Sequence, residues 1–236
     1  MNLHRGYNMF EEKTLNQMTD KPLNQIVSES TTQQIFSMEN IPQNLELSTD
    51  KVILRPLSIK HLDAFYQAGS YPKIWRWSLP DKCTSIETTQ SWIEYSVEMT
   101  KKGQHFAFAI FDKETDEFVG STRFCSMKSE DRSLEIGFTF ITPKYQRSYI
   151  NTHAKYCLLR FAFETLNVIR VEFKTHEKND KSRNAIARLG ASFEGVLRNQ
   201  RILSDGTFRN TAIFSIINSE WESVKKALEE RITQAL

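Results

Sequence analysis

The sequence is poor in cysteine, and its three cysteines, Cys83, Cys125 and Cys157, lie far apart. An odd number of widely spaced cysteines without a CxxC pair argues against a disulfide framework and favours a reducing compartment. The chain also lacks an apolar run of transmembrane length and a long apolar segment at its N-terminus. We therefore predict a cytoplasmic protein with no membrane partner.

The sequence also lacks a large excess of one charge sign, because 31 basic residues against 29 acidic ones leave a formal net charge of +2. So small an excess, with the basic residues dispersed, gives no case for nucleic-acid binding. The balance is uneven along the chain, since residues 1–50 have a net charge of −4 and the remainder has +6. The basic remainder mildly favours an anionic ligand.

Residues 1–44 differ from the rest of the chain. They are rich in Asn, Gln, Ser, Thr and Glu, and their few apolar residues follow no sustained period. Such a segment contributes little burial, so we predict a loosely ordered acidic extension that is not required for folding. Residues 45–236 then form the single folded domain.

From residue 45 onward the apolar pattern indicates regular elements. Antiparallel strands come first and a βαβ-like crossover follows, so we predict a mixed α/β fold, mostly an antiparallel twisted sheet of about seven strands with flanking helices. The predicted strands span residues 51–56, 104–111, 118–127, 133–141, 168–175, 193–203 and 207–217. The predicted helices span residues 58–68, 85–99, 152–165 and 182–189, with a last amphipathic helix at the C-terminus.

These elements carry short motifs in a fixed order. They are KVILRP (51–56), IWRW (74–77), VGSTRF (119–124), EIG (135–137), NTHAK (151–155), NDKSR (179–183) and AIARLGA (185–191). In this order the sequence resembles the GNAT superfamily of acyl-CoA-dependent N-acetyltransferases, in particular the ribosomal-protein N-terminal acetyltransferases. The resemblance covers roughly residues 45–221. It implies direct acetyl transfer from acetyl-CoA to an amine acceptor, with no metal.

The stretch PKYQRSYINTHAK, residues 143–155, connects a predicted strand to a predicted helix. Free N–H groups and the helix dipole make such a junction a site for an anion. The superfamily loop reads Gln/Arg-x-x-Gly-x-Gly/Ala, so Gln146 begins it and Tyr149 takes the first glycine position. If that position requires positive φ, Tyr149 costs about 1–2 kcal/mol. We therefore predict a weakened phosphate cradle, and a disabled one is the alternative.

The resemblance implies a set of coenzyme A contacts along this loop and after the next strand. They are Phe140, Ile141, Gln146, Arg147, Ser148, Tyr149, Ile150, Asn151, Thr152 and Asn179.

Glu135 is the candidate general base. Period-2 alternation places its carboxylate on the face opposite Leu134 and Ile136, and an attacking amine must lose a proton. The alternative is a strand glutamate paired with Arg123 on the neighbouring strand. Ser182 is the second catalytic candidate, near the thiol, although serine is equally typical of a helix N-terminus. The tyrosine acid of many superfamily members falls at Ile186, which cannot donate a proton.

Trp75, Trp77 and Arg123 are the candidate acceptor-binding residues, and core aromatics are the alternative for the two tryptophans. His153 and Cys157 share a helix face at i, i+4, which raises a Cys–His nucleophile or a metal pair. Neither gains support from the sequence, because further ligands or an orienting group are missing.

The acceptor itself cannot be read from the sequence, because the fold does not choose between a peptide N-terminus and a small-molecule amine. A catalytically impaired acyl-CoA-binding or protein-interaction module is the alternative function. The expected assembly is a monomer or homodimer.

Overall fold

The computed structural model describes residues 41–77, 83–203 and 206–234. All of them fall within one compact unit. The predicted extension, residues 1–44, lies almost wholly outside the described residues, so the boundary at Leu45 stays a prediction. Ile41, four residues before that boundary, is 1% exposed and belongs to the main apolar core.

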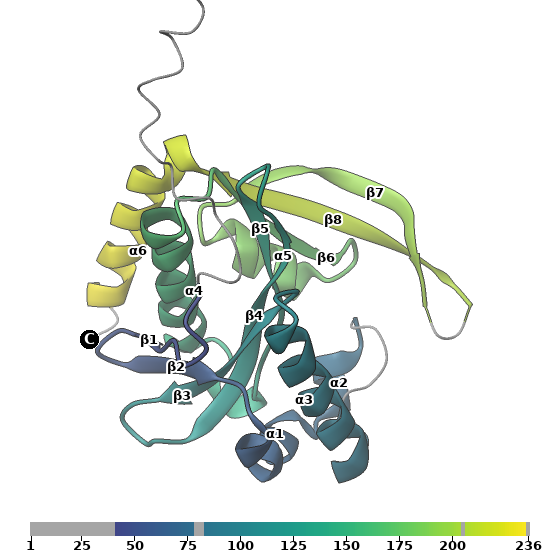
Figure 1. Cartoon of the computed structure of the whole chain (residues 1–236). Helices are drawn as coiled ribbons and strands as arrows, with labels where there is room; N and C mark the ends of the chain where they lie inside the picture. Colours follow the sequence, from purple (N-terminus) through teal and green to yellow (C-terminus); the bar gives the residue numbers. More distant parts are fainter. Residues whose placement is uncertain (1–40, 78–82, 204–205, 235–236) are drawn as a thin grey trace, which may run out of the picture. The chain divides into compact units, whose positions relative to one another are not determined.

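Eight strands of the described residues form one sheet in the order β1-β2-β3-β4-β5-β6-β8-β7 (Figure 1). The strands are β1 Leu47–Ser48, β2 Val52–Pro56, β3 Phe106–Asp112, β4 Phe118–Lys128, β5 Ser133–Ile141, β6 Arg170–His176, β7 Ser192–Ile202 and β8 Phe208–Ile217. Every neighbouring pair is antiparallel except β5 with β6, which is parallel. The predicted mostly antiparallel sheet with a central βαβ crossover is confirmed, and the two-residue β1 is an addition.

Helices cover both faces of the sheet (Figure 1). They are α1 Leu62–Gly69, α2 Pro72–Trp75, α3 Ile86–Lys101, α4 Ile150–Arg160, α5 Asp180–Ala187 and α6 Trp221–Gln234. Ser85 begins α3 with a capping box, accepting a hydrogen bond from the Thr88 N–H, as expected of a serine before an amphipathic helix. The last turn of the helix predicted over 152–165 is π-helical, from Phe161 to Thr165.

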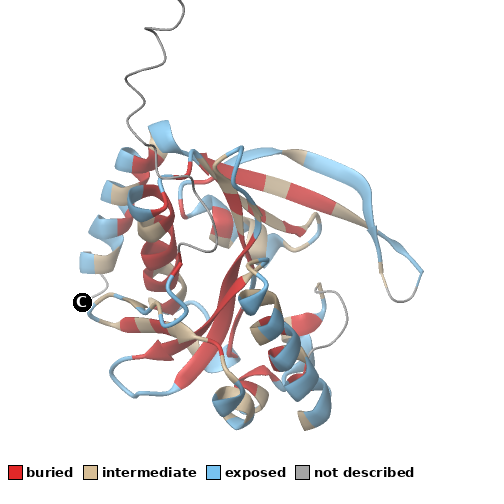
Figure 2. Cartoon of the chain, in the orientation of Figure 1, coloured by how far each residue is buried: buried red, intermediate tan, exposed pale blue. Residues whose placement is uncertain are grey.

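Two apolar cores hold these layers together. One lies between the sheet and α4, α5 and α6, and includes Phe108, Phe124 and Leu158. The other lies under α1, α2 and α3, and includes Phe65 and Phe140. Figure 2 shows the buried residues following the central strands and the inner faces of the helices. Because burial of apolar area supplies most of the folding free energy, the sheet between these cores is a rigid platform.

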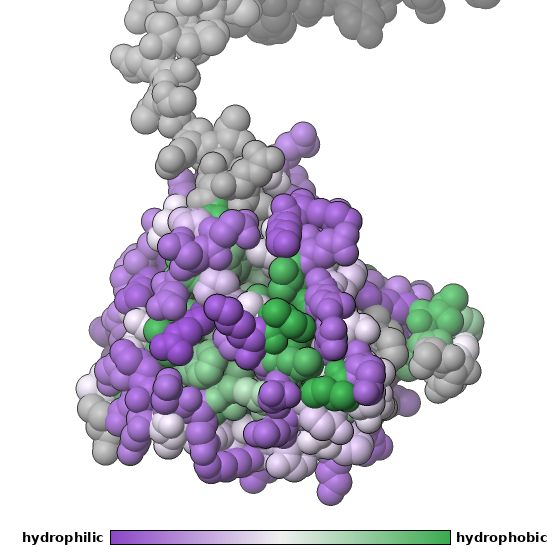
Figure 3. All heavy atoms as spheres, turned by 60° about the horizontal axis from the view of Figure 1, so that its bottom comes forward, coloured by the Kyte–Doolittle hydropathy of each residue, from purple (hydrophilic) through white to green (hydrophobic). Residues whose placement is uncertain are grey.

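The β7–β8 hairpin extends beyond the helices that cover the rest of the sheet (Figure 1). Near its tip Ile202 and Phe208 are 69% and 62% exposed, which leaves apolar surface at the right edge of Figure 3. β7 is the edge strand of the sheet, and its side chains are nearly all exposed.

The sheet opens between β5 and β6. Their pairing covers only Ser133–Glu135 against Arg170–Glu172, and the rest of β5 has no partner among the described strands on that edge. On its other edge β5 carries a bulge. Arg123 of β4 pairs with Gly137 and Ser121 pairs with Phe140, so two residues of β5 but only one residue of β4 lie between these pairs. Phe138, inside the bulge, has a φ of 51°. A bulge of this kind bends a strand away from its neighbours.

Candidate active site

The loop after β5 is braced by its own side chains. The Gln146 Nε2 donates to the Ile141 carbonyl at 3.0 Å, and the Ser148 hydroxyl donates to the Tyr145 carbonyl at 2.7 Å. The same hydroxyl accepts the Ile150 N–H at 3.3 Å, while the Ile150 side chain is fully buried. The start of α4 is therefore fixed at the end of the open edge of β5, where N–H groups of a first helical turn have no intrahelical acceptor.

Tyr149 does not take the conformation in which a Cβ is costly. Its φ is −66°, in the right-handed region, so the steric penalty considered from the sequence does not arise there. Its hydroxyl donates to the Asp112 carboxylate at 2.7 Å, which turns the ring toward the end of β3. The left-handed residue of the loop is Arg147, two positions earlier, with a φ of 66°. Glycine is the residue that this position favours, and arginine there costs about 1–2 kcal/mol.

We expect Tyr149→Phe to lower the free energy of unfolding by about 1–2 kcal/mol, because the buried Asp112 loses a hydrogen-bond donor. Acetyl-CoA affinity should stay within about twofold, since the ring points away from the loop. Denaturant unfolding and calorimetric titration measure the two quantities. Tyr145→Phe is the matched control, because its hydroxyl bonds the exposed Glu117. A loss of affinity in Tyr149→Phe would show that the tyrosine hydroxyl serves the ligand.

The pair His153 and Cys157 is buried inside the core. The Nδ1 of His153 lies 2.8 Å from the Thr49 hydroxyl, so this histidine ties α4 to the segment before β2. Burial raises the pKa of the Cys157 thiol to about 12, which keeps it protonated and unreactive at neutral pH. Among the described residues no group of three or more His, Cys, Asp or Glu side chains could hold a metal ion.

Glu135 stands where the opening between β5 and β6 begins, and its side chain is 12% exposed. Its partner is Lys174 of β6, whose Nζ lies 3.0 Å from the carboxylate, so the considered pairing with Arg123 is wrong. The Ser126 hydroxyl donates to the same carboxylate at 3.3 Å. Burial lowers the pKa of Lys174, but Glu135 and Glu172 outweigh it and raise that pKa, so Lys174 remains an ammonium group.

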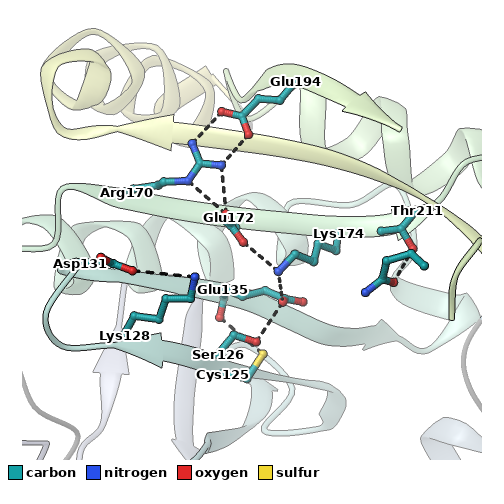
Figure 4. A network of polar contacts seen from close by, with 11 residues as sticks. Cys125, Ser126, Lys128, Asp131, Glu135, Arg170, Glu172, Lys174, Glu194 and Thr211 are labelled. Atoms are coloured by element: carbon teal, nitrogen blue, oxygen red, sulfur yellow. Dashed lines mark hydrogen bonds and ion pairs between the residues drawn. The ribbon is translucent and has the colours of Figure 1, made fainter. Parts of the chain in front are cut away.

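This ion pair is one end of a chain of charges across three strands (Figure 4). Lys174 also bonds Glu172 at 2.8 Å, Glu172 bonds Arg170 at 3.1 Å, and Arg170 bonds Glu194 of β7. Partly buried charges are stable when each is paired, and here each carboxylate has a cation. The network fixes the Glu135 side chain on the face opposite α4.

Arg123 and Trp75 lie inside the second core rather than in an acceptor wall. Arg123 is 1% exposed, donates to the Ser96 hydroxyl at 2.9 Å, and lies between the rings of Trp92 and Phe138. Arg123 therefore supports the β5 bulge through its contact with the Phe138 ring. Trp75 ends the short helix α2, which the sequence did not predict, and its Nε1 donates to the Gly69 carbonyl at 2.7 Å. We leave both residues out of the acceptor site.

Trp77 does reach the charged face. Its ring packs against His176 at the end of β6, with 4.6 Å between ring centroids. Burial lowers the pKa of His176, so the imidazole is neutral at neutral pH, and its Nδ1 accepts the Lys178 N–H. Sequence reasoning missed Lys174 and His176. The alternation of polar residues in RVEFKTH, residues 170–176, was the available signal for a charged strand face beside Glu135.

Asn179 and Ser182 begin helix α5. The Asn179 side chain accepts the Ser182 N–H at 3.2 Å, which is an N-cap. Their roles toward the pantetheine arm and the thiol stay predictions. Ile186, on the next turn, is 8% exposed and packs in the main core, in keeping with an apolar residue that donates no proton.

Lys155 of α4 is a buried lysine that has no carboxylate partner among the described residues. Its Nζ donates to the hydroxyls of Thr122 at 3.1 Å and Thr139 at 2.6 Å, directly behind the β5 bulge. Burial lowers the pKa of this lysine to about 7 from its ordinary 10.5. Between these values the unfolded chain binds more protons than the folded one, so folding stability rises as pH increases from 7 to 10.5.

We expect Lys155→Met to remove this pH dependence. The stability difference between variant and wild type should favour the variant most at pH 7 and below, and should shrink by a few kcal/mol as pH approaches 10.5. Urea unfolding at pH 6, 7, 8, 9 and 10 measures it. A difference that is constant across this range would show that Lys155 stays charged in the folded protein throughout.

Comparison with known proteins gives the family. The family described as "Acetyltransferase (GNAT) domain" matches residues 51–192, from β2 to the start of β7. The chain is a member of the GNAT acetyltransferase family. The resemblance predicted from the short motifs is thereby confirmed.

Relatives and solved structures agree with this membership. The crystal structure of a GCN5-related N-acetyltransferase from Brucella melitensis superposes with a TM-score of 0.75 at 26% identity, covering 81% of this chain and 86% of that one. The [Ribosomal protein uS5]-alanine N-acetyltransferase of Escherichia coli (strain K12) is 23% identical over 77% of this chain and 95% of its own length. Mycobacterium smegmatis RimJ, solved in complex with CoA-disulfide, has the same fold with a TM-score of 0.68 at 20% identity, covering 79% and 93% of the two chains.

Membership supports acetyl transfer, because GNAT acetyltransferases use acetyl-CoA as the acetyl donor. In this GNAT chain the candidate donor loop and the candidate base lie at the two ends of the unpaired edge of β5. Of the helices in the described ranges, none has both the length and the apolar character needed to span a membrane.

Proposed function

We propose that this GNAT acetyltransferase transfers the acetyl group of acetyl-CoA directly to a primary amine, either a peptide N-terminus or a small-molecule amine. One observation carries the proposal. The edge of β5 that β6 leaves unpaired runs from Glu135 to the fixed start of α4. An extended ligand with an anionic end can take backbone hydrogen bonds along such an edge and place its anion at the helix N-terminus.

The donor would be held by this chain's backbone from Arg147 to Thr152. Tyr149 has helical φ, its ring is turned toward Asp112, and the N–H groups of Asn151 and Thr152 in the first turn have no intrahelical acceptor. Positive charge at the same end comes from the exposed Arg147 and from Lys51, whose Nζ lies 6.0 Å from the Tyr149 ring centroid. Anions are stabilised by both the N–H groups and these cations. A structure with the same fold, M. smegmatis RimJ, is solved in complex with CoA-disulfide, which supports a coenzyme A ligand but does not locate it.

Glu135 would accept the proton that the attacking amine loses. Its ion pair with Lys174 occupies one carboxylate oxygen, so the proton passes through the second oxygen or an intervening water. The same ion pair holds the carboxylate in position. Ser182 and Asn179 would lie on the donor side at the start of α5, and the coenzyme A thiolate leaves without a dedicated acid, because the ordinary pKa of a thiol is about 8.5.

The peptide N-terminus is the first acceptor class to test. The E. coli relative is named for an alanine of ribosomal protein uS5 and matches this chain over most of both lengths. Trp77 and His176 would form the aromatic wall beside the acceptor, on the same sheet face as Glu135.

The deciding experiment measures coenzyme A release from acetyl-CoA across a panel of amines, with acetyl-CoA binding measured alongside. The panel contains peptides with different N-terminal residues, polyamines and aminoglycosides. Turnover of any amine well above acetyl-CoA hydrolysis supports the proposal. Binding without turnover would favour an acyl-CoA-binding module, for which the Lys174–Glu135 pair is the supporting observation. Absence of binding at millimolar acetyl-CoA would overturn both.

A further inference from the structure

Two arginines face each other across the β7–β8 hairpin. Arg201 of β7 is the direct partner of Arg209 of β8 in the register. Like charges opposite each other on neighbouring strands destabilise a sheet, so such a pair needs a compensating anion. Across the described part of the chain, neither guanidinium makes a hydrogen bond or ion pair, and the Nε of Arg209 is buried without an acceptor.

Among the described residues, anionic and amide groups of the hairpin and of the facing end of β6 already have other partners. Glu194 bonds Arg170 and the Ser215 hydroxyl, and Glu177 accepts the Asn210 side chain at 2.9 Å. Gln200 accepts the Thr211 hydroxyl at 2.9 Å. A buried N–H group normally has an acceptor, and the described residues supply none to the Nε of the half-buried Arg209.

The arginine pair lies on the same sheet face as the candidate base. Arg209 shares a face of β8 with Thr211 and Ser215, whose partners belong to the face that carries Glu135 (Figure 4). Burial and Arg201 lower the pKa of Arg209, while the Glu135 carboxylate opposes them.

His176 joins this group from the end of β6. After burial, Arg209 is the next cause that lowers the pKa of His176, and the histidine packs against Trp77. The arginine pair, the aromatic wall and Glu135 therefore border one region of the sheet face.

We propose that Arg201 and Arg209 bind an anionic oxygen group, a carboxylate or phosphate, on the amine acceptor. The inference rests on the proposed function, and it names the acceptor class as an amine that carries an anion a short distance from its nitrogen. Two guanidinium groups offer planar pairs of N–H donors that fit either oxyanion. Binding the anion would also relieve the repulsion between the two arginines, because the acceptor would supply the negative charge that the described residues do not place beside them.

The test compares Arg209→Gln and Arg201→Gln with the control Arg198→Gln, an exposed arginine of the same hairpin. Three peptides differ only at their second residue, which is alanine, aspartate or phosphoserine. We expect wild type to prefer the aspartate or phosphoserine peptide by about 10- to 100-fold in kcat/KM, mainly through KM. Each glutamine variant at 201 or 209 should lose that preference and keep its rate on the alanine peptide. The aspartate and phosphoserine arms separate the two anion sources.

Equal rates of wild type on all three peptides, or a preference that survives in Arg209→Gln, would overturn the inference while leaving acetyl transfer intact. A fall in melting temperature for the glutamine variants would show instead that the pair is structural, because removing like-charge repulsion should hold or raise it. If no peptide is turned over, calorimetric binding of the N-acetylated peptides decides the matter. Wild type should then bind the anionic products at least tenfold more tightly than Arg209→Gln does, and equal affinity would overturn the inference.

Discussion

Glu135→Gln should lower the turnover of acetyl transfer by about 10²–10⁴-fold, the usual contribution of a general base. Glutamine keeps the size and hydrogen-bonding shape of the side chain but cannot accept the amine proton. Lys174 retains Glu172 as a partner at 2.8 Å, so the strand face should stay assembled. Acetyl-CoA affinity should be nearly unchanged, because the donor loop lies at the other end of β5. Steady-state rates on an identified acceptor, with calorimetric titration of acetyl-CoA, measure both effects.

Glu172→Gln is the matched control for that substitution. Glu172 also bonds Lys174, and it lies on β6 directly opposite Glu135, where it is in addition paired with Arg170. We expect its turnover to stay within a few-fold of wild type. Equal losses in the two variants would mean that Glu135 acts through the charge network alone, and wild-type turnover in Glu135→Gln would remove it from the mechanism.

Ser148→Asp should weaken acetyl-CoA binding by about 10- to 100-fold while lowering the free energy of unfolding of the unliganded protein by less than about 1 kcal/mol, because the hydrogen bond donated to the Tyr145 carbonyl is lost but the helix dipole is better compensated. A carboxylate next to the start of α4 can accept the Ile150 N–H as the serine does, and it interacts favourably with the helix dipole. The same carboxylate repels the diphosphate of the donor at short range. A loss of acetyl-CoA affinity that is clearly larger than the loss of stability distinguishes a binding site from a folding element. Thermal unfolding with and without acetyl-CoA gives both numbers.

Ser148→Asn is the control, since asparagine has the same shape without the charge. Its acetyl-CoA affinity should remain close to that of wild type. If the aspartate variant binds acetyl-CoA as tightly as the asparagine variant, the phosphates lie elsewhere and the proposed donor site is wrong.

Elements with a long apolar period could be predicted from the sequence, and elements set by tertiary contacts could not. The strand predicted over 133–141 and the helix from Ser85 were placed within about two residues. The four-residue α2 and the two-residue β1 have too few positions to show a period. Trp75 is an example. The sequence did not predict helix α2, and this helix places the Trp75 ring in the core instead of in the predicted acceptor wall.

The candidate site was predictable in its position along the chain but not in its partners. Alternation placed Glu135 on the correct face, yet the pairing with Lys174 depends on a parallel ladder between residues far apart in sequence. The motif placed the unusual loop residue at Tyr149, whereas the left-handed backbone is at Arg147. Backbone dihedral angles follow from how the loop closes onto Gln146 and Ser148, and no residue pattern encodes that closure directly. Arg201 and Arg209 meet only through two irregularities in the β7–β8 register.

The short β5–β6 ladder also affects how the protein unfolds locally. Strands β1 to β5 pair with sequence neighbours, and β6, β8 and β7 form a second antiparallel set, so backbone hydrogen bonds join the two sets through three residue pairs. Packing against α4 and α6 supplies the rest of the connection. Such an architecture favours two cooperative opening units in native-state hydrogen exchange, separated at the ladder. A donor lying along the unpaired edge would bridge both units, so acetyl-CoA should merge their exchange into one global transition.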